Sequence, residues 1–384
     1  MTLAGACGAL PAQTLTFQEA LDAAAQHHPA ALSAGLQARQ QRQLLPVATA
    51  LPDPLVTAES PTGEFYTVGV AQSFALPVAY RRQKALQQAH AERAESAVAA
   101  TQQQVRYRTA LAYNDLQYRL ALVAQLRNQD SLLQDIAAAA ARMFEQGRTD
   151  AVASQFARLQ AASLRIRLHQ AEQDAVIAES QLQTLTGITS RITPEPMERV
   201  SVPAIIPDSA AWNHNPALQT LRQESLVAER QVAVEKSRGL PQLTLGYLNQ
   251  GGRNSPVGNR FNAGISIPLC RKRYGAGAEA AQTGVEVARQ NLAAESLALD
   301  AAWRRASGEA EKNRRALEDY EQNVLPAARS IGDASRRLFE GGLADLVSYL
   351  RNRKDVLEAE LGYWELRRAY RVAEIELRYL GGTL

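Results

Sequence analysis

The chain carries one series of short motifs twice, and this duplication constrains its fold more than any other feature. Four pairs match in the same order: HHPAAL at His27–Leu32 with HNPAL at His214–Leu218, QSFALP ending at Pro77 with ISIPL around Pro268, MFEQGRTD at Met143–Asp150 with LFEGGLAD at Leu338–Asp345, and LTG at Leu185–Gly187 with LGG at Leu380–Gly382. The spacing between Pro29 and Pro216 is 187 residues, and that between Phe144 and Phe339 is 195. A constant order with a slowly drifting spacing indicates an internal repeat.

The segment between the two copies is rich in proline, which favours a linker. Its four prolines are Pro194, Pro196, Pro203 and Pro207. We therefore expect a residual signal or N-terminal segment at 1–13, a first repeat at 14–187, a linker at 188–208 and a second repeat at 209–384. Each repeat is predicted to contain a helix, two strands, a very long helix, a tight turn and a return helix.

The first repeat has no Gly or Pro between Val78 and Gln146. Within this stretch a coiled-coil seam runs through Val105, Ala112, Leu116, Val123, Leu126 and Leu133. A helix over residues 81–142 would be about 90 Å long, at about 1.5 Å per residue. No single globular domain needs a rod of this length. The second repeat is predicted to contain a similar rod over residues 276–338, interrupted by Gly308 and kinked at Pro326.

The predicted strands alternate between large apolar and small polar residues. In the first repeat, Tyr66, Val68, Val70, Phe74 and Leu76 share one face, opposite Thr67, Gly69, Ala71, Ser73 and Ala75. This pattern fits a barrel strand between lipid and a lumen, although a soluble sheet packed on one side would show it too. Four strands cannot close a barrel, because about eight is the usual minimum. Either the sheet is open, or several chains contribute to one barrel.

Composition and charge exclude several classes of protein. Aromatic residues make up 6% of the chain, and its net charge is +3. Stretches rich in Gln, Ala, Glu and Arg suit extended helices better than compact cores. Because the basic residues are spread out, nothing indicates nucleic-acid binding. No segment has 18 consecutive apolar residues, so a membrane crossing would require strands closed into a barrel.

No residues have the spacing of a catalytic, cofactor or metal site. His27, His28 and His214 stand beside prolines near predicted helix ends, where capping or exposure is favoured over metal binding. GAGAEA at Gly275–Ala280 matches GxGxxA, but no compact βαβ unit surrounds it. We therefore predict no enzyme activity, no cofactor and no metal ligand.

The first residues of the chain are small and apolar, as at the end of a secretory signal. Leu10–Ala12, before Gln13, is a candidate cleavage site. An alternative is a lipoprotein signal, AGAC, which would make Cys7 the acylated residue. A plain flexible N-terminus is the third interpretation.

The order of the predicted elements, together with four stretches, resembles the TolC-like outer-membrane efflux factors. The stretches are Thr14–Leu32, NVLPAARS from Asn323, LFEGGLADLVSYL from Leu338, and ELRYLGG from Glu376. The resemblance implies a mostly α fold with a small β part. Long antiparallel coiled-coil helices would form an α-barrel, and four strands would contribute to a trimeric 12-stranded outer-membrane β-barrel.

The resemblance also implies a function and partners. The chain would be a homotrimeric, passive export duct for small molecules or metal ions, placed in the outer membrane and extending into the periplasm. Its partners would be a periplasmic adaptor (membrane fusion) protein and an inner-membrane pump of the resistance-nodulation-division (RND) type. The alternative is a soluble periplasmic coiled-coil scaffold or adaptor protein without a channel.

By the resemblance, the turns between the long and return helices form the periplasmic tip. The tip residues are Gly147, Arg148, Asp150, Gly342, Leu343 and Asp345. The glycines suit left-handed helix ends, and the aspartates suit N-caps of the return helices. We expect Arg148 and Leu343 to be exposed for adaptor docking, and Arg148 and Asp150 to be available for a charge pair that closes the pore. The family often has an acidic residue six positions after the tip glycine, where this chain has Ala153 and Ser348.

Basic residues follow the prolines that end the outgoing strands, at Arg81–Arg82 and Arg271–Arg273. Cations at a helix N-terminus oppose the helix dipole. We expect anionic lipid head groups of the outer membrane to bind these cations. The alternative is that they are solvated basic residues in a loop.

Overall fold

The computed structural model describes residues 13–60, 63, 65–197, 211–252 and 255–384. Cys7, the candidate cleavage site and most of the linker lie outside these residues. The helices are α1 (Phe17–His27), α2 (Pro29–Gln43), α3 (Pro77–Glu145), α4 (Ala151–Thr186), α5 (Pro216–Arg238), α6 (Arg271–Asp319), α7 (Leu325–Glu340) and α8 (Leu346–Leu380). The strands are β1 (Gln13–Leu15), β2 (Leu55–Glu59), β3 (Phe65–Ala75), β4 (Ile192–Pro194), β5 (Gln242–Gly252) and β6 (Ser255–Ser266).

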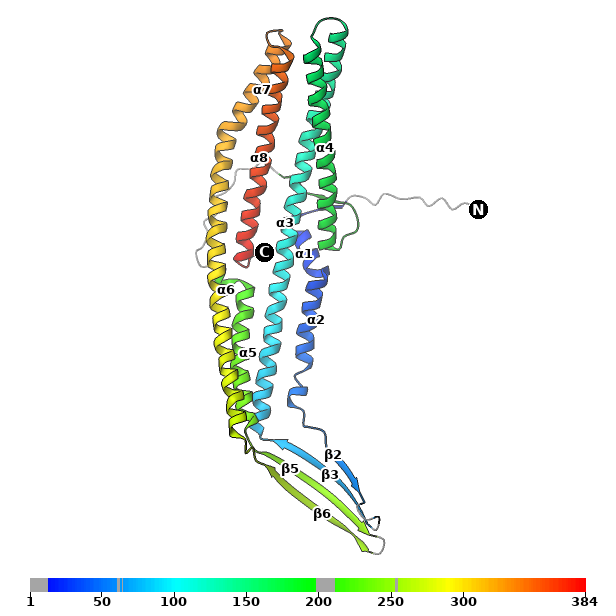
Figure 1. Ribbon diagram of the computed structural model, residues 1–384, viewed down its shortest axis with the longest axis vertical. Coiled ribbons are helices and arrows are strands. Elements are labelled where there is room, and N and C mark those ends of the chain that lie inside the picture. The colour runs from blue at the N-terminus through cyan, green and yellow to red at the C-terminus, as the bar shows by residue number, and fades with distance from the viewer. Residues whose placement is uncertain (1–12, 61–62, 64, 198–210, 253–254) are drawn as a thin grey trace, which may run out of the picture. The chain divides into compact units, whose positions relative to one another are not determined.

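The two repeats have the predicted order of elements. In the first, β2 and β3 precede the long helix α3, a turn and the return helix α4. In the second, β5 and β6 precede α6 and α7, a turn and the return helix α8. The mostly α fold with a small β part is confirmed (Figure 1).

The chain divides into two compact units that are not the two repeats. The first unit comprises Met1–Leu32, Gln102–Asn213 and Leu299–Leu384, and the second comprises Ser33–Thr101 and His214–Ala298. Each unit therefore takes segments from both repeats, and α3 and α6 run through both. The repeat boundaries at 14–187 and 209–384 stay a prediction.

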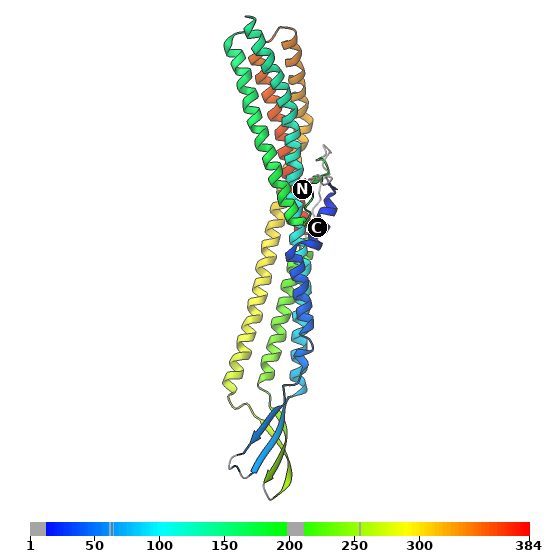
Figure 2. The same ribbon diagram turned by 90° about the vertical axis from the view of Figure 1, so that its right-hand side faces the viewer.

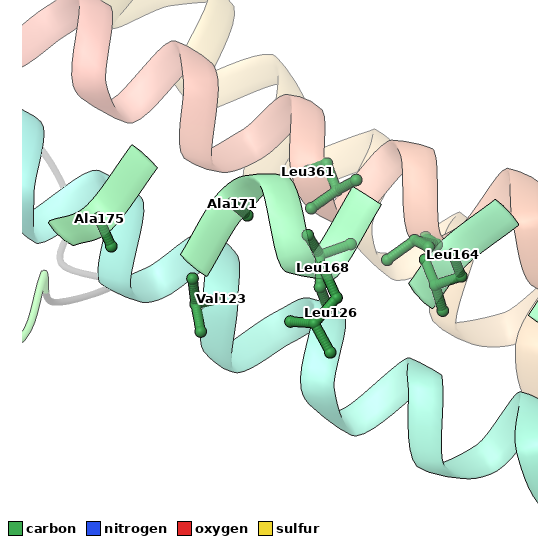
Figure 3. Close-up of a cluster of buried hydrophobic side chains, with 8 residues drawn as sticks. Val123, Leu126, Leu164, Leu168, Ala171, Ala175 and Leu361 are labelled. Carbon is green, nitrogen blue, oxygen red and sulfur yellow. The ribbon is translucent and has the colours of Figure 1, made fainter. Parts of the chain in front are cut away.

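Helix α3 is one uninterrupted helix of 69 residues, about 100 Å long at about 1.5 Å per residue. Its predicted seam is buried at Val105, Leu116, Val123 and Leu126. Figure 3 shows part of the core of the first unit, where Val123 and Leu126 of α3 face Leu164 and Leu168 of α4, with α8 alongside. The long α3 is thus held by tertiary packing along one apolar stripe.

The second rod is broken near Pro326 but not at Gly308. Gly308 lies inside α6, which continues to Asp319. A π-helical turn, Tyr320–Val324, then leads into α7, where Pro326 occupies the first turn. Proline is accepted there because the first N–H groups of a helix have no partner within it. The predicted interruption at Gly308 was therefore wrong, because a single glycine costs a helix only about 1 kcal/mol relative to alanine.

The π turn packs closely against α8 at Gly362, where Tyr320 of the turn contacts the glycine. A Cβ atom on Gly362 would collide with the hydroxyl of Tyr320 and lie 3.3 Å from its Cζ. The hydroxyl of Tyr363 also hydrogen-bonds Glu321 Oε1 at 2.9 Å. Gly362 thus provides the space in which the turn packs on α8.

Strands from both repeats form one antiparallel sheet of order β2-β3-β5-β6 (Figures 1 and 2). β3 pairs with β5 from Phe65↔Gly252 to Ala75↔Gln242 and so joins the repeats. A short parallel pair, β1 with β4, was not predicted from the sequence. The buried Tyr113 fastens this pair, because its hydroxyl donates to the carbonyl of Leu15 at 2.8 Å and accepts from the N–H of Glu195 at 3.0 Å. Burial raises the pKa of Tyr113 to about 12.

Candidate functional site

The first tip turn joins α3 to α4 and is closed by backbone hydrogen bonds. The N–H of Arg148 donates to the carbonyl of Met143 at 2.8 Å, and the N–H of Gly147 donates to that of Phe144 at 2.9 Å. These are the two bonds of a Schellman motif, which requires one residue in the left-handed conformation. Gly147 takes that position with φ of 67°. The predicted helix end is confirmed.

The second tip turn, between α7 and α8, has the same geometry. The N–H of Leu343 donates to the carbonyl of Leu338 at 2.8 Å, and the N–H of Gly342 donates to that of Phe339 at 3.0 Å. Gly342 has φ of 71°. The MFEQG and LFEGG motifs therefore produce one local structure twice.

The predicted N-caps are also confirmed. Asp150 Oδ1 accepts from the N–H of Ala153 at 2.7 Å, and Asp345 Oδ1 accepts from the N–H of Ser348 at 2.9 Å. The second cap has one more bond, because Ser348 Oγ donates to Asp345 Oδ2 at 2.7 Å. The hydrogen bonds from the Ser348 side chain and then its backbone lower the pKa of Asp345.

Apolar side chains are exposed around both turns. Leu343 is 80% exposed, and Phe144, Val152 and Leu338 are exposed as well. Arg148 is also exposed. Within the described residues no ion pair joins Arg148 to Asp150, whose Oδ1 is used by the cap. The tips therefore present exposed apolar side chains beside an exposed arginine.

One buried cluster brings the two tips together at the same end of the first unit (Figure 1). Its members are Ala137, Ala140, Ala153, Ala157, Ala161, Leu346, Tyr349 and Leu350. Phe339 of α7 stacks on Tyr349 of α8, with ring centroids 4.7 Å apart. Small alanines on α3 and α4 meet larger side chains from α8, so the hairpins pack closely. The six predicted tip residues thus belong to one surface.

At the sheet, the face predicted to be apolar lies exposed in the single chain. Register places Val70 beside Tyr247 and Val56, and Leu243 beside Phe74 and Ile265. Phe261 and Ile265 are 84% and 67% exposed. The other face carries small and polar residues: Thr57, Thr67, Gly69, Ser73, Thr244, Gly246, Gln250, Arg260 and Asn262. A sheet that exposes its apolar face to the outside of the chain calls for lipid or another apolar surface there.

The basic segments lie at the starts of the two long helices. Arg271 begins α6, and Arg81 and Arg82 lie in the second turn of α3, which begins at Pro77. Arg82 Nη1 donates to the carbonyl of Ala233 at 3.2 Å, so one of these cations has a structural role.

Polar links between α3 and α8 were missed by the sequence analysis. Arg368 lies 2.7 Å from Asp115 and 5.1 Å over the ring of Tyr118. Arg353 Nη2 donates to Gln129 Oε1 at 2.6 Å. Asp115, Tyr118 and Gln129 lie on α3 between the seam residues Ala112 and Leu133. The seam predicts that this part of α3 packs against another helix, but a single sequence does not reveal which one. These links hold the two hairpins of the first unit together.

Solved outer-membrane channels share this fold. CmeC from Campylobacter jejuni matches with a TM-score of 0.82 and 14% identity, covering 96% of this chain and 86% of that one. VceC from Vibrio cholerae gives 0.79 and 13%, covering 95% and 96%. MtrE from Neisseria gonorrhoeae, in its open state, gives 0.78 and 14%, covering 96% and 89%. At these identities the likeness shows the fold.

The sequence of the second repeat matches one family model. Residues 209–383 match the family model of the outer membrane efflux proteins. The matched segment is the predicted second repeat, which is less than half of the chain. No curated protein matches it in sequence.

The matched model describes outer membrane efflux proteins, and the solved structures that share the fold include outer-membrane channels. Among the described residues, no helix is both long and apolar enough to cross a membrane. Likewise, the described residues contain no group of three or more His, Cys, Asp or Glu side chains able to hold a metal ion. Cys270 is a free, exposed thiol.

Proposed function

We propose that this chain is an outer membrane efflux protein, three copies of which assemble into one passive export duct. The observation that carries the proposal is the sheet, which has four strands and an exposed apolar face. Four strands are too few to enclose a pore, whereas twelve are enough for a barrel with an open lumen. The exposed apolar face would then contact lipid, and the polar face would line the lumen.

The edges of the sheet support the same assembly. β2 and β6 are its two edge strands, and each leaves one row of backbone groups without a partner strand. Unpaired edges are unfavourable, and closure into a barrel removes them. Pairing β6 of one copy with β2 of the next would satisfy both rows. A coiled-coil scaffold without a channel would leave the edges and the apolar face uncovered.

The long helices would continue the duct through the periplasm to the tip turns. Two exposed residues there, Leu343 of the second tip turn and Arg148 of the first, would bind the periplasmic adaptor. The adaptor would link the duct to an inner-membrane pump of the RND type. Exposed apolar residues on a rigid turn are typical of such contacts. Arg81 and Arg271 would contact anionic head groups of the outer membrane. Small molecules or metal ions would pass through without binding.

Replacing Leu343 by Asp tests the docking role of the tip. Cells with the complete efflux system should lose export, because a charge placed in an apolar contact is costly. The purified variant should still have the mass of three chains in detergent. The matched control is Leu297→Asp, at a residue of α6 that is 72% exposed. Normal export by Leu343→Asp, or equal loss by the control, would contradict the proposal.

A further inference from the structure

Two glycines on the polar face of the sheet hold side chains of the neighbouring strand. Register places Thr57, Gly69, Leu248 and Arg260 in one row across the four strands. The next row contains Leu55, Ala71, Gly246 and Asn262. In each row a glycine stands beside a larger residue. A glycine inside a strand often marks such a close approach.

Leu248 of β5 lies across Gly69 of β3. A Cβ atom on Gly69 would be 2.5 Å from Leu248 Cδ2 and 3.0 Å from Thr57 Oγ1. Gly69 is buried, and Leu248 is only partly exposed although it is an apolar residue on the polar face. The leucine therefore lies along the sheet instead of standing on it.

Asn262 of β6 lies across Gly246 of β5 in the same way. A Cβ atom on Gly246 would collide with Asn262 Oδ1 and lie 3.0 Å from its Cγ. Both side chains lean by one strand in the direction of β2. In these two adjacent rows, the side chains of Leu248 and Asn262 therefore lie close to the backbone of the sheet and project little from its polar face.

Other glycines of the sheet lack one or the other of these properties. Gly264 is on the polar face, but its nearest neighbour for a Cβ would be Thr244 Cβ at 4.0 Å, which leaves ordinary space. Gly251 does hold a large side chain, because Tyr66 Cζ would be 2.8 Å from its Cβ. That pair lies on the apolar face, with Val68 and Val70. Gly264 and Gly251 can therefore serve as control positions for substitutions at Gly69 and Gly246.

We propose that Gly69 and Gly246 set the inner width of the pore, by holding Leu248 and Asn262 flat against its wall. The proposal rests on the closed pore proposed above, in which the polar face lines the lumen. With a Cβ at either glycine, the flexible end of the neighbouring side chain must leave its place. The backbone on one side and lipid on the other leave the lumen as the space it can enter.

The variants should fold, because the atoms nearest to each new Cβ are ends of flexible side chains, and the one backbone atom close by, the carbonyl oxygen of Tyr247, would lie 3.3 Å from the Cβ at position 69 and need shift by only a few tenths of an ångström. Alanine also removes the conformational penalty that glycine imposes on a strand. A change in the pore is therefore separable from a loss of structure.

Polymer exclusion in planar bilayers measures the width directly. Neutral polyethylene glycols of graded size are added on the side of the pore that the strands form, and polymers that enter lower its conductance. Gly69→Ala and Gly246→Ala should shift the size limit for entry to smaller polymers. Gly264→Ala and Gly251→Ala should leave the limit of the wild type.

Removing the displaced side chain should restore the width. Asn262→Ala in the Gly246→Ala background, and Leu248→Ala in the Gly69→Ala background, should return the limit to that of the wild type or above. An unchanged limit in both single variants, an equal shift in Gly251→Ala, or failure of both restorations would overturn the proposal. A wild-type protein that does not conduct at all would instead contradict the pore itself.

Discussion

At the scale of single residues, the two tip turns differ in one position that matters for their stability. Both return helices begin with an aspartate cap, but Asp345 accepts from the hydroxyl and the N–H of Ser348, whereas Asp150 accepts from the N–H of Ala153. The additional bond favours the ionised carboxylate and is the first cause of the lowered pKa of Asp345. The response of the α8 cap to acid should therefore depend on Ser348.

Acid should open the start of α8, and it should do so at a higher pH when Ser348 is replaced. A carboxylate whose pKa is lowered in the folded state stabilises the fold fully above its ordinary value, here 3.8, and loses that contribution as the pH falls through the lower folded value. Hydrogen exchange of the first turns between pH 5 and about 3 measures this directly. In Ser348→Ala the first turn of α8 should open at a higher pH than in the unmodified protein, because the bond that lowers the pKa of Asp345 most is removed. Identical profiles of the α8 turn in the variant and in the unmodified protein would contradict this account of the cap.

At the scale of elements, the sequence predicted the long helices, tip turns and strand pairs, because each has a strong local pattern. Each of these patterns depends on neighbours within a few residues along the chain. Examples are the seam through Leu116 and Leu126, the helix end at Gly147 and the alternation around Val68. The π turn before Pro326 and the β1–β4 pair depend on contacts far along the chain, such as that of Tyr320 with Gly362. Such contacts leave no periodic signal in one sequence.

The seam of α3 should carry much of the stability of the first unit. Leu126 is fully buried, and Leu159 on α4 is 59% exposed. Leu126→Ala should lower the free energy of unfolding by about 3 kcal/mol, because it leaves a cavity among packed side chains. Leu159→Ala should change it by less than about 0.5 kcal/mol. Thermal denaturation in detergent compares the stability of the two variants. A similar loss of stability in both would show that the packing of α3 is not the main source of the stability of the first unit.

At the scale of the whole molecule, the account depends on what covers the apolar face of the sheet. The alternation of residues predicted two faces, but the sequence alone left a sheet packed on one side as an equal alternative. The structure decides that point, since Phe261 and Ile265 have no covering element among the described residues. The membership of the polar face, and the glycines that lie beside larger residues on it, became apparent only from the strand register.

A lysine on the apolar face should prevent insertion, whereas one on the polar face should be tolerated. Ile265→Lys places a charge where lipid is expected, at a cost of about 2–4 kcal/mol near the middle of a bilayer. Thr244→Lys adds the same charge to the face that would line water. The yield of folded protein in outer membranes should fall for the first variant and stay near that of the wild type for the second. Equal yields would mean that the apolar face does not contact lipid.

Single-channel recording of the purified protein tests the central claim most directly. Protein extracted with detergent and sized as three chains should insert into a planar bilayer and conduct ions in discrete, equal steps, because the joined sheets enclose water. A protein that remains a single chain in detergent, or a trimer that leaves the bilayer electrically silent, would contradict the account.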